Sequence, residues 1–212
     1  MSGALIVFSW NQVHAETINY SEPIKVALER CLDTHGGMVT TAEFADTSSW
    51  RLEPEAPFNT MFSSILTTSW DQGQSTETID YAASAALLSL ANSSEQPNHH
   101  GFAYEEAFLA VLDIDALGES SPNCIISGPA EVAVVLTSHL ATTGAITKPN
   151  DDWFKVPLTN HDALLILNVH PDLAALSRTS PRLNGPEILT DWSVRFRPVS
   201  LMVRLSPAQE QK

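Results

Sequence analysis

Hydrophobic residues recur along this chain with two different periods. Some stretches place them three or four residues apart, as on one face of a helix, and others are short apolar or alternating runs typical of strands. The predicted helices cover residues 21–37, 75–94, 102–118 and 129–140, and the predicted strands cover residues 3–10, 123–126, 152–158, 162–170 and 192–205. This pattern predicts an α+β fold, a mixed α/β architecture with a central β-sheet flanked by helices, plus extended loop and arm segments.

Residues 38–75 differ from the rest because prolines, serines and threonines interrupt short β-prone runs, with no helical period. We interpret this stretch as strands and long loops. The chain is then one assembly subunit over residues 1–212. Approximately residues 1–75 form an extended arm, the first helix and long loops, and residues 76–212 form an α/β core that ends in a strand pair.

The clearest local motif is the strand, turn and helix of "NCIISGPAEVAVVLTSHL", residues 123–140. The amino end of a helix after a strand can bind an anion through free backbone amides. Here residues 127–131 contain one glycine, a proline without an amide hydrogen and Glu131, which already carries negative charge. A structural connection is therefore the favoured interpretation, and a small ligand near Ser127–Glu131 is the alternative.

Charge is distributed very unevenly. The formal net charge is -14, and no lysine or arginine occurs between Arg51 and Lys148, where we count twelve acidic residues. Residues 178–204 instead contain five arginines against two acidic residues. Because nucleic-acid binding relies on basic surfaces that neutralise phosphates, we expect no direct sequence-specific binding of nucleic acid.

Complementary charge favours and orients association between molecules. The acidic middle of one copy is therefore predicted to meet the arginine-bearing C-terminal segment of the next. The residues assigned to this subunit interface are Arg195, Arg197, Arg204, Glu105 and Glu106. The alternative is that the acidic residues only keep the protein soluble.

Cysteine usage bears on the compartment. Cys31 and Cys124 are the two cysteines, far apart and flanked by apolar residues. This favours two buried thiols in a reducing compartment, with a single bridge between them as the alternative. Residues 1–15 lack the basic start and long apolar run of a secretory signal, and no run reaches the roughly 18 apolar residues of a membrane span. We expect no membrane partner.

Candidate chemistry is sparse. His161 beside Asp162, and His170 near Asp172, lie at the ends of predicted strands, where acid–base groups are often found. No nucleophile is identifiable for them. The histidines at 99 and 100 lie near two glutamates, but without a metal-binding motif they are predicted to form a solvated loop. We expect no catalytic residue, no metal and no cofactor.

From Phe102 to Leu205 the predicted order is a long helix, the strand "NCIIS", the helix "GPAEVAVVLTSHL", a proline-containing loop, the strand "ALLILNV" and the strand pair "WSVRFRPVSLMVRL". This order resembles the major shell protein of tailed bacteriophages, a fold also used by encapsulin compartments. The terminal "RFRPVSLMVRL" is similar to the last strand of that family. The chain is short for the family, whose extended loop and N-terminal arm would fall on residues 38–75 and 1–20.

The resemblance implies a structural, self-assembling protein, a capsid shell subunit of a virion. Its partners would be copies of itself, with other virion proteins as further candidates. It would be located in the virion, or otherwise in the cytoplasm. Two alternatives come from the residues: an α/β enzyme with a dispersed active site near His161 and His170, and a protein-binding adaptor with an exposed apolar patch at Trp50 or Trp70.

Overall fold

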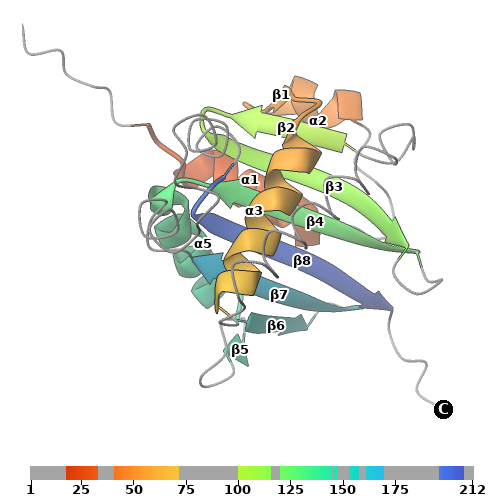
Figure 1. Ribbon diagram of the computed structural model, residues 1–212, viewed down its shortest axis with the longest axis vertical. Helices are drawn as coiled ribbons and strands as arrows, with labels where there is room; N and C mark the ends of the chain where they lie inside the picture. The colour runs from red at the N-terminus through yellow and green to blue at the C-terminus, as the bar shows by residue number, and fades with distance from the viewer. Residues whose placement is uncertain are drawn as a thin grey trace, which may run out of the picture.

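A single antiparallel sheet organises the described part of the molecule (Figure 1). The computed structural model describes residues 18–32, 41–71, 100–115, 120–144, 146–147, 153–157, 161–169 and 196–207. Within them eight strands lie in the order β1-β2-β3-β4-β8-β7-β6-β5. Their bounds are β1 (Arg51–Leu52), β2 (His100–Tyr104), β3 (Ala107–Asp115), β4 (Ser120–Gly128), β5 (Ile146–Thr147), β6 (Trp153–Pro157), β7 (His161–Val169) and β8 (Val199–Pro207).

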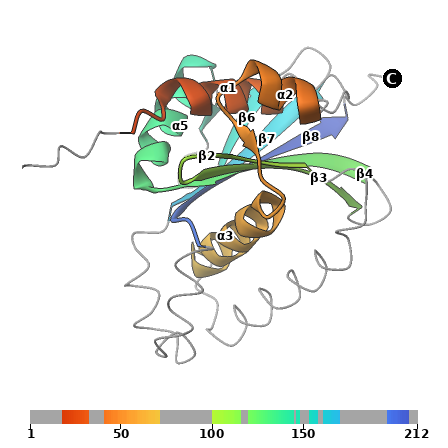
Figure 2. The same cartoon turned by 90° about the horizontal axis from the view of Figure 1, so that it is seen from above.

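Helices cover both faces of this sheet (Figure 2). Helices α1 (Ser21–Leu32), α2 (Thr41–Thr47) and α5 (Ala130–Thr142) lie on one face, and α3 (Ala56–Asp71) crosses the other. The predicted α+β class, with a central sheet flanked by helices, is therefore confirmed.

Residues 102–118 do not form the helix that their spacing predicted. The described part of this range, residues 102–115, belongs to the β2–β3 hairpin, in which Phe102 pairs with Leu109 and Tyr104 with Ala107. Leu109 packs in the core on the side of α1, α2 and α5, whereas Phe108 and Ala110 pack in separate clusters. Because both faces of the sheet are buried, the strand shows no alternation of polar and apolar residues, and its alanines were compatible with a helical period.

Residues 38–75 also correct the prediction, because the described part contains α2 and α3 rather than long loops. All the α3 side chains described between Ala56 and Thr67 are buried or half-buried. The hydroxyls of Thr60, Ser63 and Thr67 each donate to the carbonyl oxygen four residues earlier, at 2.8 Å. A helix rich in serine and threonine is thereby buried without leaving these donors unpaired. It lies across the sheet built by later residues, so this region belongs to the core.

The first helix forms as predicted over Ser21–Leu32, and its apolar side faces the sheet with Ile24, Ala27 and Leu28 fully buried. The two cysteines are not free thiols. Cys31 on α1 and Cys124 on β4 form a disulfide with their Cα atoms 5.6 Å apart, which corrects the prediction of two thiols in favour of the single bridge.

The motif at 123–140 is a strand, a short turn and a helix, as predicted. The strand is longer, Ser120–Gly128, and Pro129 precedes the first helical residue, Ala130. A Cβ at position 128 would lie 2.6 Å from Cγ2 of Val132, so glycine permits the close return of α5 towards the sheet.

Several predicted elements lie outside the described residues: the strand at 3–10, the helix at 75–94, and the segment 192–195 before the last strand. The same holds for most of the proposed N-terminal arm. Within the described residues, no helix is both long enough and apolar enough to cross a bilayer.

The disulfide closes a loop between residues 93 positions apart. We expect the double substitution Cys31→Ala/Cys124→Ala to lower the free energy of unfolding by about 3–5 kcal/mol, chiefly because the unfolded chain regains conformational freedom. Urea unfolding measures this difference. A reducing agent should destabilise the unaltered protein and leave the double variant unchanged; a double variant as stable as the unaltered protein would contradict the structural role of the bridge.

Gly101 on β2 lies directly beneath the start of α3. A Cβ there would be 2.4 Å from both the carbonyl oxygen of Glu53 and Cδ of Pro57. Gly101→Ala should therefore cost about 2–3 kcal/mol of stability through overpacking. Gly144→Ala is the control, because its φ of +75° is strained but nothing lies within 4 Å of the added atom, and it should cost only about 1 kcal/mol. Thermal unfolding of the two variants compares these costs; equal losses would contradict the close packing at Gly101.

Candidate functional site

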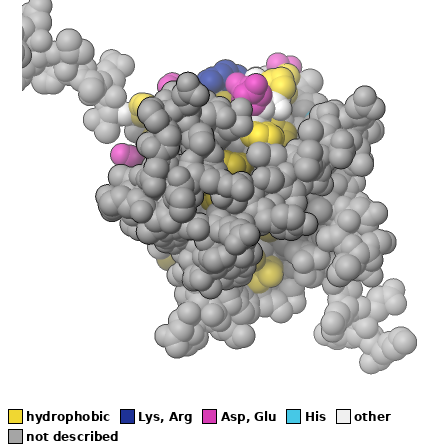
Figure 3. All heavy atoms as spheres, viewed as in Figure 1, with side chains coloured by type: hydrophobic (Ala, Val, Ile, Leu, Met, Phe, Trp, Pro, Cys, Tyr) yellow, Lys and Arg dark blue, Asp and Glu magenta, His cyan; other side chains and the backbone are white. Residues whose placement is uncertain are grey.

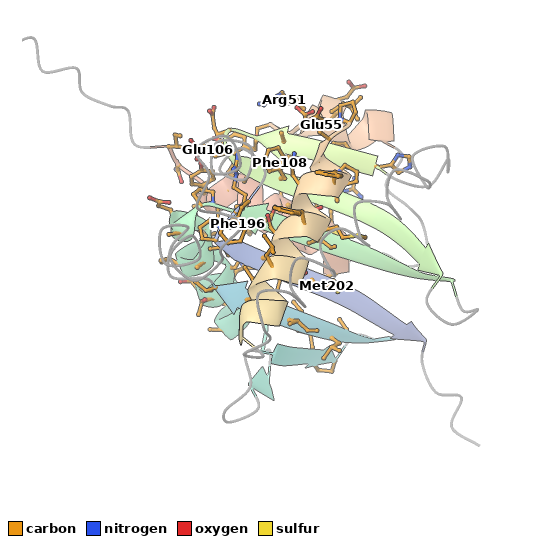
Figure 4. The ribbon with its side chains drawn as sticks, in the orientation of Figure 1. Arg51, Glu55, Glu106, Phe108, Phe196 and Met202 are labelled. Carbon is orange, nitrogen blue, oxygen red and sulfur yellow. A yellow bond between two sulfur atoms is a disulfide. The ribbon has the colours of Figure 1, made fainter. Side chains whose placement is uncertain are left out.

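Arg197 and Glu106, two of the residues predicted to form an interface, meet within one chain, at the β2–β3 turn that also contains Glu105. Figure 4 shows Glu106 and Phe108 at this part of the sheet. Nε of Arg197 donates to the carbonyl oxygen of Glu106 at 2.8 Å, and its guanidinium carbon lies 5.0 Å from the ring centre of Phe108. The backbone amide of Arg197 donates to Oγ of Ser63 on α3 at 2.8 Å. Arg197 therefore joins the start of β8 to the hairpin turn and to α3.

Arg197 contacts Glu106 through the backbone carbonyl oxygen of that residue. Burial lowers the pKa of Arg197, and the negative charge of Glu106 partly opposes that shift. The carboxylates of Glu105 and Glu106 are exposed. Arg195 and the side chain of Arg204 lie outside the described residues. The acidic middle and the arginine-bearing tail thus meet inside one molecule, and their predicted contact between copies stays a prediction.

The turn itself has an unusual backbone. Glu105 has φ +50°, a left-handed conformation that favours glycine. The ring of Tyr20, just before α1, packs edge-on against Tyr104 with centroids 6.0 Å apart. Burial raises the pKa of the Tyr20 phenol; a hydrogen bond with the backbone of Glu106 lowers it, and nearby carboxylates raise it further. These contacts fix α1 to the hairpin and leave its two carboxylates in solvent.

A second feature lies on the opposite layer, on the side of α5 that points away from the sheet. The helical spacing predicts a buried stripe of Val132, Val135, Leu136, His139 and Leu140. Val132, Leu136 and Leu140 are buried, whereas Val135 and His139 are half-buried. The outward side is exposed, with Val134 on it 69% exposed, and it carries one charged residue, Glu131 in the first turn. We call its uncharged residues the neutral face; they are Ala130, Val134, Thr137, Ser138 and Ala141.

The sequence reasoning missed the neutral face because it treated α5 as an ordinary amphipathic helix. Such a helix carries charged or polar residues opposite its core stripe. In "AEVAVVLTSHLAT" the one acidic residue is Glu131, in the first turn, and no lysine or arginine follows. The absence of charge over three turns was visible in the sequence, but only the structure shows which side faces solvent.

Helix α1, which packs against α5, and α5 itself are nearly balanced in charge. Helices α1 and α5 together carry two basic and three acidic residues, in a chain with a net charge of -14. Lys25 and Glu29 on α1 form an ion pair at 3.9 Å, and both side chains are about half exposed. Between the two helices lies an open hollow of about 590 Å³, lined by Val26, Glu29, Arg30, Leu32, His139 and Thr143. Charged side chains of both signs also gather at the edge of the sheet that carries β1 (Figure 3), where Arg51 and Glu55 lie (Figure 4).

The other predicted sites find less support. His161 begins β7, but its side chain, together with His170 and Asp172, lies outside the described residues. His100 is not in a solvated loop but pairs with Val111 in the sheet. Among the described residues, no group of three or more histidine, cysteine, aspartate or glutamate side chains is placed to hold a metal ion.

The adaptor alternative placed an exposed patch at Trp50 or Trp70. Trp50 is only 2% exposed, and its indole nitrogen donates to the carbonyl oxygen of Pro23 at 2.9 Å. It therefore anchors the start of α1 and forms no exposed patch. The side chain of Trp70 lies outside the described residues.

Arg197→Met should lower the free energy of unfolding by about 1–3 kcal/mol, because the side chain loses its hydrogen bonds and its cation–π contact. Arg197→Lys keeps the charge but lacks the planar guanidinium, and should recover less than half of this loss. Arg51→Met is the control, since Arg51 is exposed on the edge strand, and should change stability by less than about 0.5 kcal/mol. Urea unfolding measures all three; normal stability with weakened association of Arg197→Met would point to a contact between copies.

Comparison with known proteins does not place the chain in a family, since no family model, curated protein or solved structure matches it.

Proposed function

We propose that this protein is a structural subunit that acts by associating with copies of itself, through the neutral face of α5. The observation that carries the proposal is an exposed helix surface centred on Val134 that carries one charged residue, Glu131, on a chain with a net charge of -14. The helix presents apolar or small residues both to the core and to solvent. Covering this side of the helix with another protein buries no charge apart from that of Glu131, so it costs little desolvation.

The charge of the chain favours a second copy as the partner. Two molecules that each carry -14 repel one another over most possible approaches. Helices α1 and α5 together carry two basic and three acidic residues, a net charge of -1. Contact there brings little like charge together, so the burial of apolar surface is opposed by little repulsion.

This proposal keeps the self-assembly that the sequence predicted but bases it on a different contact. Arg197 is held within its own chain by Glu106 and Phe108. The resemblance to phage shell proteins also began with a long helix at residues 102–118, where the structure has the β2–β3 hairpin. A shell subunit remains the finer form of the proposal, and a closed shell needs at least one further contact besides that of the neutral face.

The disulfide bears on where such a subunit works. Cys31 and Cys124 are 1% and 7% exposed, and the bridge joins α1 to the sheet. Disulfides of this structural kind form and persist in oxidising environments and on the surfaces of virions. A virion or another oxidising location is thus a better match to the bridge than the cytoplasm.

Sedimentation velocity over a range of concentrations tests the proposal. The unaltered chain should form dimers or larger species as concentration rises. Val134→Glu should weaken this association at least about tenfold, since the added carboxylate would be buried at the contact without a partner. Leu52→Glu is the matched control, because Leu52 is 55% exposed on β1 and lies away from α5.

Circular dichroism establishes that both variants are folded before their masses are compared. A chain that stays monomeric at about 100 μM, a concentration well above typical dissociation constants of specific complexes, would overturn the proposal. Equal weakening by the two substitutions would also contradict it, because the contact would then not lie on α5.

A further inference from the structure

We infer that the hollow between α1 and α5 binds a small carboxylate that has an apolar body. This site goes beyond the proposed self-association and does not depend on it, since no residue of the neutral face lines the hollow. The two helices pack together on one face of the sheet (Figure 2), and the hollow of about 590 Å³ lies between their C-terminal halves. Its volume is typical of a small-molecule site, for which the range is about 300–1,000 Å³.

One side of each helix supplies the walls of the hollow. On α1, Glu29 and Arg30 follow Val26 by three and four residues, and on α5, Thr143 follows His139 by four. Residues at these spacings lie on the same side of a helix. Arg30 and His139 are both half-buried. The regular helical spacing therefore brings polar side chains from two distant parts of the chain to one hollow.

Hydrogen-bond acceptors around the hollow are already engaged within the chain. The carboxylate of Glu29 pairs with Lys25 at 3.9 Å. At the end of α5, the hydroxyl of Thr143 donates to the carbonyl oxygen of Leu140 at 2.9 Å, and its amide donates to that of His139 at 3.1 Å. A cationic ligand would have to compete with these internal donors, so the hollow is poorly suited to it.

Two donors that line the hollow are not engaged in this way. Among the described residues, no carboxylate forms an ion pair with Arg30, and no acceptor bonds to the ring of His139. The planar guanidinium of an arginine matches the two oxygens of a carboxylate with two parallel N–H groups. Because Lys25 is paired with Glu29, Arg30 supplies one uncompensated positive charge. A singly charged carboxylate fits this charge better than a doubly charged phosphate ester.

The apolar part of the ligand would lie against Val26 and Leu32, which are half-buried on α1. This wall is held in place, because Cys31, between Arg30 and Leu32, is bonded to Cys124 on β4. The core side of α5 is buried as well, which fixes the opposite wall. A site whose walls are already ordered loses little affinity to their immobilisation. The hollow is therefore formed before a ligand enters.

Nuclear magnetic resonance titration with octanoate tests the inference. Octanoate should shift the backbone amide signals of residues 26–32 and 139–143 saturably, with a dissociation constant of about 1 mM or lower, as expected for a ligand of this size. Arg30→Met removes the charge and the donors but keeps an apolar stem, so it should weaken binding at least about tenfold. Arg51→Met is the matched control, because it removes the same charge from an exposed residue that does not line the hollow. It should leave the dissociation constant unchanged.

Three further probes separate the contributions of charge and apolar surface. Octanol has the apolar chain without the charge, octylammonium has the opposite charge, and inorganic phosphate has negative charge without the chain. Each should bind at least about tenfold more weakly than octanoate, since each lacks one of the two matched features. Octanol that binds as tightly as octanoate, or phosphate that binds more tightly, would overturn the inference.

Two other results would also overturn it. Octanoate that causes no saturable shift up to about 20 mM would show that the hollow holds only solvent. Equal weakening by the two arginine substitutions would show that octanoate does not contact Arg30. Circular dichroism establishes that both variants are folded. Sedimentation tests the neutral face separately, so this site and the proposed self-association can fail independently.

Discussion

The fold depends on the insertion of the last described strand, β8, between β4 and β7. Its residues pair with both neighbours, so that Leu201 lies opposite Ile126 on one side and Leu167 on the other. Without β8 the sheet would be two separate groups, β1 to β4 and β5 to β7. Strand β8 therefore completes the sheet, although its other seven described strands all come earlier in the chain. Each residue of the joined sheet faces either the layer of α1, α2 and α5 or the layer of α3. The long-range pairings of β8 therefore allow both faces of the sheet to be buried.

The position of β8 also explains the Arg197 contacts. Arg197 lies two residues before the strand begins, and the pairing of Val199 with Gly128 fixes its place beside the hairpin turn. There its guanidinium packs over Phe108 and donates to Glu106, while its amide donates to Ser63 on α3. One residue thus joins three parts of the chain that are far apart in sequence. The same pairing brings β4 to its end at Gly128, where α5 starts its return over the opposite face.

The sequence was informative where one face of an element is apolar and the other is polar. Helix α1 shows such a face, and so does the core side of α5, and both formed as predicted. The highly apolar β7 was also predicted, as the strand at residues 162–170, and it lies between β6 and β8. Prediction failed where burial is complete. Strand β3 is covered on both faces, which removed the alternation that marks a strand, and α3 hides its serine and threonine hydroxyls by bonding them to its own carbonyl oxygens.

For the candidate site, the sequence supplied the residues but not their geometry. It singled out Arg197, Glu105 and Glu106 from charge alone, and these do lie together, but within one chain. No local pattern could distinguish a contact within a chain from one between copies, because that choice depends on the pairing of β8 with β4. The disulfide was an open alternative for the same reason, since sequence does not give the distance between α1 and β4. The sequence shows that residues 130–142 carry only one charged residue, Glu131. It does not show that the neutral face is exposed, because that depends on the layer in which α5 lies.

The central claim is that copies of this chain meet through an uncharged surface and not through opposite charges, and the salt dependence of association separates the two cases directly. Raising the salt concentration from about 0.1 M to about 1 M shortens the Debye length from about 10 Å to about 3 Å. If the copies meet at the neutral face, this screening removes repulsion between molecules of charge -14, so the dissociation constant measured by sedimentation should fall. A dissociation constant that rises over the same range would show that attraction between opposite charges holds the copies together, and would contradict this account.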